Sequence, residues 1–156
     1  HAFVPDLQRR LQVPILNMIE ACRAAILRRL PEIQRIGLLA TSGTVRSGVY
    51  AKTLDAAGIL TLCPSSSSQE SLVMQSIYGP EGIKALGGKN PLARRQLLQA
   101  AKELIAAGAE ALILGCTEIP LVIGQSDFDI PCFDPSQILA QAAVNKALQQ
   151  DVQKDA

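Results

Sequence analysis

The chain has 156 residues, of which 48% are hydrophobic and only 3% aromatic, so its interior must be built from aliphatic side chains. This length is enough for one domain with a full core, or for two incomplete lobes. The 15 Lys and Arg residues are balanced by 14 Asp and Glu residues, which excludes the basic surface typical of proteins that bind nucleic acid or anionic membranes. We therefore expect the chain to bind a small molecule rather than a nucleic acid or a membrane.

The sequence also predicts the cellular compartment of the protein. No apolar run reaches the roughly 18 residues that a membrane-spanning helix needs. Four cysteines, at positions 22, 63, 116 and 132, are widely and unequally spaced with no CxxC pair, which argues against a disulfide framework or a zinc site. We predict a cytoplasmic protein, and we expect Cys63 and Cys132, which lie in short apolar runs, to be packing residues.

Hydrophobic periodicity predicts the elements in chain order. Helices are predicted at residues 2–11, 19–30, 47–57, from 69 to 78, 92–107 and 137–149. Strands are predicted at residues 13–18, 36–40, 59–63, 111–114 and 130–133. This order predicts an α/β fold, a parallel-sheet αβα sandwich with right-handed crossovers.

The stretch 111–124, ALILGCTEIPLVIG, carries the first candidate for chemistry. In an open α/β sheet, residues just past the carboxyl end of a strand line the ligand crevice, and Cys116, Thr117 and Glu118 occupy that position here. Free cysteine often packs as a small hydrophobe, so a packing role for Cys116 stays open. Its neighbours favour chemistry, because Thr117 and Glu118 need water, a partner or a ligand.

Two further polar sites precede this stretch. The loop Thr41-Ser42-Gly43-Thr44 follows a predicted strand, and its hydroxyl and N–H groups could hold a carboxylate or phosphate. A loop that only caps the following helix is an equally good interpretation. Lys84 precedes a flexible Gly-Gly turn, and it is either a solvated helix charge or a cation at a turn that closes over a cleft.

These segments resemble the aspartate/glutamate racemase family, in its branch of aspartate and broad-specificity acidic amino acid racemases. LGCTEIPLVI (114–123) is similar to the family's second catalytic-cysteine motif, and IGLLATSGTVRSGVY (36–50) is similar to the opening strand and substrate loop of its second lobe. VPILNMIEA (13–21) resembles the run into the interlobe helix. The resemblance covers essentially the whole chain in motif order. Glutamate racemases carry His where this chain has Glu118, which points towards aspartate or a broader specificity.

The resemblance implies racemisation of an acidic amino acid, with aspartate as the first candidate and glutamate as the alternative, without pyridoxal cofactor or metal. Two cysteines act on opposite faces of the α-carbon, because one base that stays on its face only restores the original enantiomer. By resemblance Cys116 serves one face. The residues expected to bind substrate or orient the thiol are Thr41, Ser42, Thr44, Lys84, Thr117 and Glu118, although Lys84 lies about two residues farther from the cysteine than in the family.

The first catalytic cysteine of the family lies in a CNTAH-like motif, of which only the final His1 is present. The alternative is that His1 is a tag residue or an ordinary chain end. We expect residues 1–32 to be a remnant of the first lobe with the interlobe helix, 33–130 to be the second lobe, and 131–156 to be a strand and helix that return to the first lobe. The chain alone is not expected to racemise, and a homodimer is a further expectation from the family.

Two other functions stay open. A truncated, non-catalytic module could bind a small carboxylate through residues 41–44 and Lys84. Less favoured is another enzyme with paired cysteines, such as a hydantoin racemase or a maleate isomerase. Replacing Cys116 by Ser, with the upstream segment restored, separates catalysis from binding alone.

Overall fold

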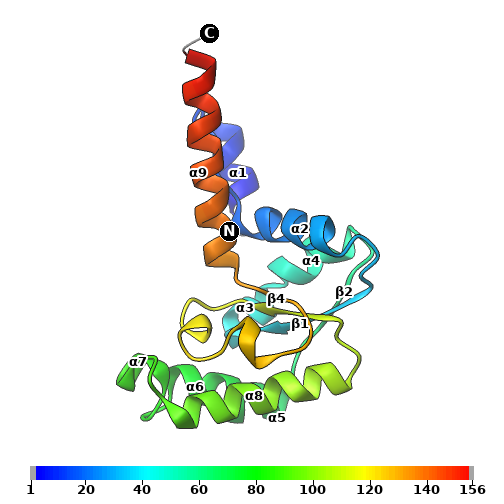
Figure 1. Ribbon diagram of the computed structural model, residues 1–156, viewed down its shortest axis with the longest axis vertical. Helices are drawn as coiled ribbons and strands as arrows, with labels where there is room; N and C mark the ends of the chain where they lie inside the picture. Colours follow the sequence, from blue (N-terminus) through cyan, green and yellow to red (C-terminus); the bar gives the residue numbers. More distant parts are fainter. Residues whose placement is uncertain (1–2, 155–156) are drawn as a thin grey trace.

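The computed structural model describes residues 3–154. Within this part of the chain, four short strands form one sheet in the order β2-β1-β3-β4, and all neighbours are parallel (Figure 1). The strands are β1 (Arg35–Leu39), β2 (Leu60–Leu62), β3 (Ala111–Leu114) and β4 (Cys132–Phe133). The predicted α/β fold with a parallel sheet is confirmed.

Helices lie on both faces of the sheet. The α-helices of the described residues are α1 (Val4–Arg10), α2 (Met18–Arg29), α3 (Ser42–Ser47), α4 (Val49–Asp55), α5 (Ser66–Ser68), α6 (Gln75–Tyr78), α7 (Ile83–Leu86), α8 (Pro91–Ala106) and α9 (Pro135–Lys154), of which α1 and most of α9 extend away from the sheet. A π-helical segment, Gln69–Met74, joins α5 to α6, and 3-10 turns occur at Ile119–Leu121 and Gln125–Asp127. In Figure 1, α2 and α4 lie on one side of the strands, and α5, α6 and α8 lie on the other.

The central strands β1 and β3 supply both halves of the core. Side chains alternate along a strand, so Ile36 and Leu38 of β1 pack with the α2 and α4 side, whereas Leu39 packs with α8. In β3, the side chain of Ile113 packs with the α2 and α4 side, and that of Leu112 packs with the α8 side. Both faces are apolar because both are covered, as is typical of parallel sheets.

Several residues that the sequence predicted to begin or end helices do so in the structure. The side chain of Asn90 accepts from the N–H of Ala93 at 3.0 Å, and Pro91 follows as the first helical residue of α8. Gly108 has φ +94°, the left-handed conformation that lets the chain turn after this helix. Ser65 likewise caps α5 by accepting from the N–H of Ser68. The short helix therefore begins at Ser66, three residues before the predicted start.

Two predicted elements are wrong. Residues 13–17 form no strand and Val13 is 71% exposed, since none of the strands in the described part of the chain pairs with this run. The side chain of Asn17 accepts from the N–H of Ile19 and starts α2 at Met18. The helix predicted at 47–57 is α4, which begins at Val49 because Gly48 adopts φ +67° and separates it from α3. Residues 42–44, predicted as a loop, form the first turn of α3.

Candidate active site

The segments that follow β1 and β3 meet at the carboxyl edge of the sheet. The N–H of Gly115 donates to the carbonyl of Leu39 at 2.7 Å, which continues the pairing of the two strands by one residue. A Cβ on Gly115 would lie 2.9 Å from Leu38 Cδ1 and 3.1 Å from the Ala40 side chain. A larger residue there would require at least the Leu38 side chain to shift, so glycine permits this close approach of the Cys116 turn to β1.

Cys116 is half-buried and contacts the carboxylate two residues later. Its Sγ donates to Glu118 Oε2 at 2.9 Å, and the hydroxyl of Thr117 donates to the same oxygen at 2.9 Å. Burial, followed by the hydrogen bond to Glu118, raises the pKa of Cys116 to about 11. The donated hydrogen bonds, that of Cys116 first, lower the pKa of Glu118 to about 2. At neutral pH the pair is therefore a thiol beside a carboxylate.

Lys84 reaches the same carboxylate from α7. Its Nζ lies 3.3 Å from Glu118 Oε1 and 4.6 Å from the centre of the Tyr78 ring. The hydrogen bond to Glu118 is the main reason that the pKa of Lys84 is raised. The structure thus brings together four residues singled out in the sequence, Cys116, Thr117, Glu118 and Lys84, and adds Tyr78, which the sequence analysis did not identify.

The loop after β1 lies beside this group at the same edge. The hydroxyls of Thr41 and Thr44 are 3.1 Å apart, and Thr41 also accepts from the N–H of Thr44, so this loop does cap α3. Ser42 differs from both threonines, because it is 5% exposed and its hydroxyl donates to Glu70 Oε1 at 2.6 Å. The hydroxyl of Ser42 is thus held by the π-helical segment, whereas Thr41 and Thr44 are half-buried at the start of α3.

Gln69 is a supporting residue that the sequence analysis missed. It is 6% exposed, and its Nε2 donates to the carbonyl of Ala40 at 2.9 Å, just before the Thr41 loop. It is the first residue of the π-helical segment, a distortion that occurs often at functional sites. No local signal in the sequence marks this role, because the partner, Ala40, lies 29 residues earlier, directly after β1.

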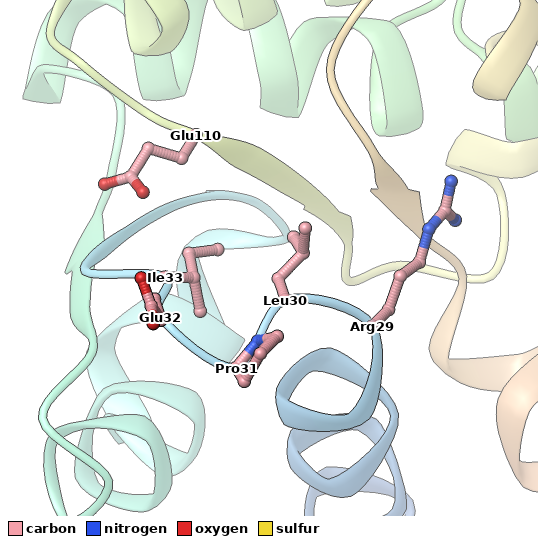
Figure 2. Close-up of a pocket in the computed structure, with 6 residues that line it drawn as sticks. All are labelled: Arg29, Leu30, Pro31, Glu32, Ile33 and Glu110. Atoms are coloured by element: carbon pink, nitrogen blue, oxygen red, sulfur yellow. The ribbon is translucent and has the colours of Figure 1, made fainter.

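Two cavities lie at opposite edges of the sheet. One of about 290 Å³ is lined by residues of α2, α3 and α4 and by Gly115, so it adjoins the Cys116 turn. A larger one of about 490 Å³ lies at the amino edge, between the end of α2 and Glu110, the residue before β3 (Figure 2). The carboxylate of Glu110 there pairs with Arg35 at the start of β1. The larger cavity is therefore remote from the thiol.

The other cysteines occupy three different environments. Cys22 is buried, Cys132 is half-buried in β4, and Cys63 is exposed just beyond β2. The prediction that Cys63 packs in the interior is wrong, because β2 ends one residue earlier, at Leu62. Among residues 3–154, no group of three or more His, Cys, Asp or Glu side chains could hold a metal ion. His1 lies outside the described residues.

None of the helices within the described part of the chain combines the length and the apolar character needed to cross a bilayer.

Comparison with known proteins gives consistent matches. The Asp/Glu/hydantoin racemase family matches residues 1–143. An uncharacterised protein from the pnlA 3′ region of Pectobacterium carotovorum is 33% identical over 121 residues, 77% of this chain and 75% of that protein. A glutamate racemase of Thermus thermophilus is 33% identical over 144 residues, 90% of this chain and 48% of that enzyme.

The fold has close counterparts of known structure. The crystal structure of an aspartate racemase homologue from Pyrococcus horikoshii superposes with a TM-score of 0.79 at 30% identity, covering 94% of this chain and 62% of that chain. This chain thus spans about half the length of the Thermus racemase and less than two thirds of the Pyrococcus protein. With the family match over nearly the whole sequence, the chain belongs to the Asp/Glu/hydantoin racemase family.

Proposed function

We propose that this chain takes part in cofactor-independent racemisation of an acidic amino acid, with Cys116 as the acid–base group for one face of the α-carbon. The observation that carries the proposal is the thiol of Cys116, held 2.9 Å from the carboxylate of Glu118 at the carboxyl edge of a parallel sheet. Ligands bind at this edge in open α/β sheets. Family membership makes amino acid racemisation the reaction class to expect.

The resting protonation state gives Cys116 its first role. Because its pKa is raised to about 11, the group is a thiol at neutral pH and can act as the acid. A base on the opposite face removes the α-proton, and the electron pair of the broken C–H bond is delocalised into the adjacent carboxylate. Cys116 then gives its proton to the α-carbon and becomes a thiolate. In the reverse direction this thiolate is the base, and the positive charge of Lys84 favours it.

The substrate would be held by charge and by hydroxyl groups. Lys84 is the cation nearest to Cys116 in the described contacts, and it is available to a carboxylate once its pair with Glu118 opens. The hydroxyls of Thr41 and Thr44 lie on the loop after the neighbouring strand. Aspartate is the preferred candidate because Glu118 stands where glutamate racemases have His, and the Pyrococcus relative is called an aspartate racemase homologue. Glutamate is the second candidate.

The base for the opposite face is, in this proposal, the family's other catalytic cysteine, which the resemblance assigns to a CNTAH-like motif. Residues 33–130 would form the second lobe, with residues 1–32 and 131–156 contributing to the first. In Figure 1, α1 and most of α9 extend away from the sheet, which suits such a division. Exposed apolar side chains on α1, including Leu7, are compatible with further contacts there, and a homodimer remains part of the proposal.

Deuterium exchange tests the role of the thiol without requiring both bases. The chain is incubated in D₂O with L-aspartate and, separately, with D-aspartate, and loss of the α-proton signal is followed by NMR. We expect exchange of one enantiomer with retention of configuration, because a single base returns deuterium to the face from which it took the proton. Cys116→Ser should abolish this exchange, and Cys63→Ser, which alters an exposed thiol beyond β2, should not.

Two results would count against the proposal. Exchange that persists in Cys116→Ser would assign the chemistry to another group. Binding of aspartate with no exchange of either enantiomer would favour the non-catalytic carboxylate-binding module instead. The proposal also includes a cytoplasmic location, which fractionation of the native host can test.

A further inference from the structure

Tyr50 presents a buried hydroxyl that the reaction described above does not use. The residue is 2% exposed, and within residues 3–154 its phenolic oxygen has no hydrogen-bond partner. We propose that Tyr50 is an additional substrate-binding residue, whose O–H donates to an oxygen of the carboxylate that Lys84 does not take. This inference rests on the proposed function, because it assumes a substrate with two carboxylates at Cys116.

The cavity of about 290 Å³ gives the ligand a place to lie. Its lining comes from the start of α2, from α3, from the start of α4 and from the turn after β3: Met18, Ile19, Gly43, Thr44, Ser47, Val49, Tyr50 and Gly115. Gly115 is the residue directly before Cys116. Cys116 itself packs on the α8 side of the core and Tyr50 on the α2 and α4 side, so a ligand in contact with both would lie across the carboxyl edge of the sheet.

Tyr50 is the polar group in this lining that lacks a partner. The hydroxyl of Thr44 lies 3.1 Å from that of Thr41, and the hydroxyl of Ser47 donates to the carbonyl of Thr44 at 2.7 Å. A buried hydroxyl without a partner costs free energy, so such groups in folded proteins are nearly always paired. The phenol of Tyr50 is consequently ready to donate to a ligand that enters beside it.

The phenol acts as a donor and not as a base. Burial raises the pKa of Tyr50 above its ordinary value, and nearby Cys22, Asp134 and Cys116 raise it further, so the hydroxyl stays protonated at every physiological pH.

The cavity and Lys84 would contact opposite ends of the substrate, and they differ in charge. None of the residues that line the cavity is charged, whereas Lys84 carries a positive charge on the other side of the Cys116 turn. A dicarboxylate could thus place one group against the ammonium and the other against neutral O–H donors. The neutral end would favour an oxygen acceptor over an ammonium group, because the protonated phenol of Tyr50 and the hydroxyl of Thr44 can donate to a carboxylate.

The sequence makes a direct observation of Tyr50 practical, because the chain has two tyrosines and no tryptophan. The chain is labelled with ¹³C at the tyrosine Cζ, and the two NMR signals are followed as L-aspartate or D-aspartate is added. The signal absent from Tyr50→Phe identifies Tyr50. We expect it to move on binding, and we expect Tyr50→Phe to weaken aspartate affinity at least tenfold, the value of one hydrogen bond to a charged group. The melting temperature of ligand-free Tyr50→Phe should not fall.

The outcomes separate the two proposals. If aspartate binds the wild-type chain, the Tyr50 signal does not move and Tyr50→Phe binds equally well, the inference about Tyr50 is wrong and the proposed function stands. If Tyr50→Phe melts at a lower temperature with unchanged affinity, the phenol has a structural partner and the inference is again wrong. If neither enantiomer binds the wild-type chain, both proposals fail.

Discussion

Cys116 donates its S–H to the carboxylate of Glu118 across 2.9 Å, within one turn that follows a buried strand. This hydrogen bond favours the ionised form of Glu118 and the protonated form of Cys116. It keeps Glu118 ionised, with a pKa of about 2, and it helps to keep Cys116 protonated, with a pKa of about 11. Each of the following predictions changes this contact or the backbone that supports it.

Glu118→Gln should lower the pKa of the Cys116 thiol. The substitution removes the carboxylate that accepts the S–H and repels a thiolate, and it leaves the positive charge of Lys84 without its partner. Burial, the largest cause of the raised pKa, remains, so the value should fall from about 11 without reaching that of an exposed thiol. The measurement is the pH dependence of Cys116 alkylation by iodoacetamide, read by peptide mass spectrometry.

Thr117→Val is the matched control, because it removes a donor to Glu118 and leaves the carboxylate in place. Its alkylation profile should stay close to that of the wild type. An unchanged profile in Glu118→Gln would show that the carboxylate does not set the protonation of the thiol.

Lys84→Met should weaken aspartate binding at least tenfold, since a charged group in contact with a carboxylate contributes about 1.5–3 kcal/mol. The unfolding midpoint should change little, because the Lys84–Glu118 pair is largely exposed on the lysine side and exposed ion pairs contribute about 0–1 kcal/mol. Isothermal titration calorimetry and thermal melts provide the two measurements. Lys89→Met, at an exposed lysine a few residues later, is the control that should retain affinity. Equal losses of aspartate affinity in both variants would show that the ligand responds to the overall positive charge of the chain and not to a specific contact with Lys84.

Acid should destabilise the chain partly through Glu118. Its pKa is lower in the folded chain than in the unfolded chain, so the folded state gains stability above the ordinary value of about 4.5, and this gain is lost as pH falls towards about 2. Asp127, whose pKa is lowered mainly by Arg94, contributes with the same sign. Urea unfolding at a series of pH values from 7 to 2.5 should show a flatter acid limb in Glu118→Gln than in the wild type. If the stabilities of the wild type and Glu118→Gln change in parallel with pH, Glu118 does not contribute to the acid destabilisation.

Gly115→Ala should destabilise the chain by about 1–3 kcal/mol, the cost of forcing extra volume into a packed site. The new Cβ would lie 2.9 Å from Leu38 Cδ1 and 3.3 Å from the Leu39 carbonyl, so β1 or the Cys116 turn must move. Denaturant unfolding measures the loss, and the exchange reaction in D₂O should decrease with it.

Gly124→Ala is the control for this substitution, because a Cβ there meets nothing within 4 Å and its backbone is extended, with φ −161°. It should change stability by no more than about 0.5 kcal/mol. Similar destabilisation in both alanine variants would contradict the role given to the close approach at Gly115.

Errors in the sequence analysis arose where a local pattern depends on a partner elsewhere. The apolar run at residues 13–17 has the composition of a strand, but no strand lies beside it, and the side chain of Asn17 begins a helix instead. Cys63 follows an apolar run, but the pairing of β2 with β1 stops at Leu62, which leaves the thiol exposed. Strand pairing is a property of two segments, so one segment cannot reveal where it ends.

The sequence by itself determined the parallel α/β architecture and the position of Cys116 after a buried strand. Continuous apolar runs, helical periodicity and Gly or Asn at element ends are local features, and each acts within a few residues. The tertiary structure decided which distant side chains reach that strand end: Lys84 at Glu118, Gln69 at Ala40, and the unpaired hydroxyl of Tyr50 beside Gly115. These contacts depend on the strand order β2-β1-β3-β4 and on the crossover helices, and they form only when separate segments pack around one core.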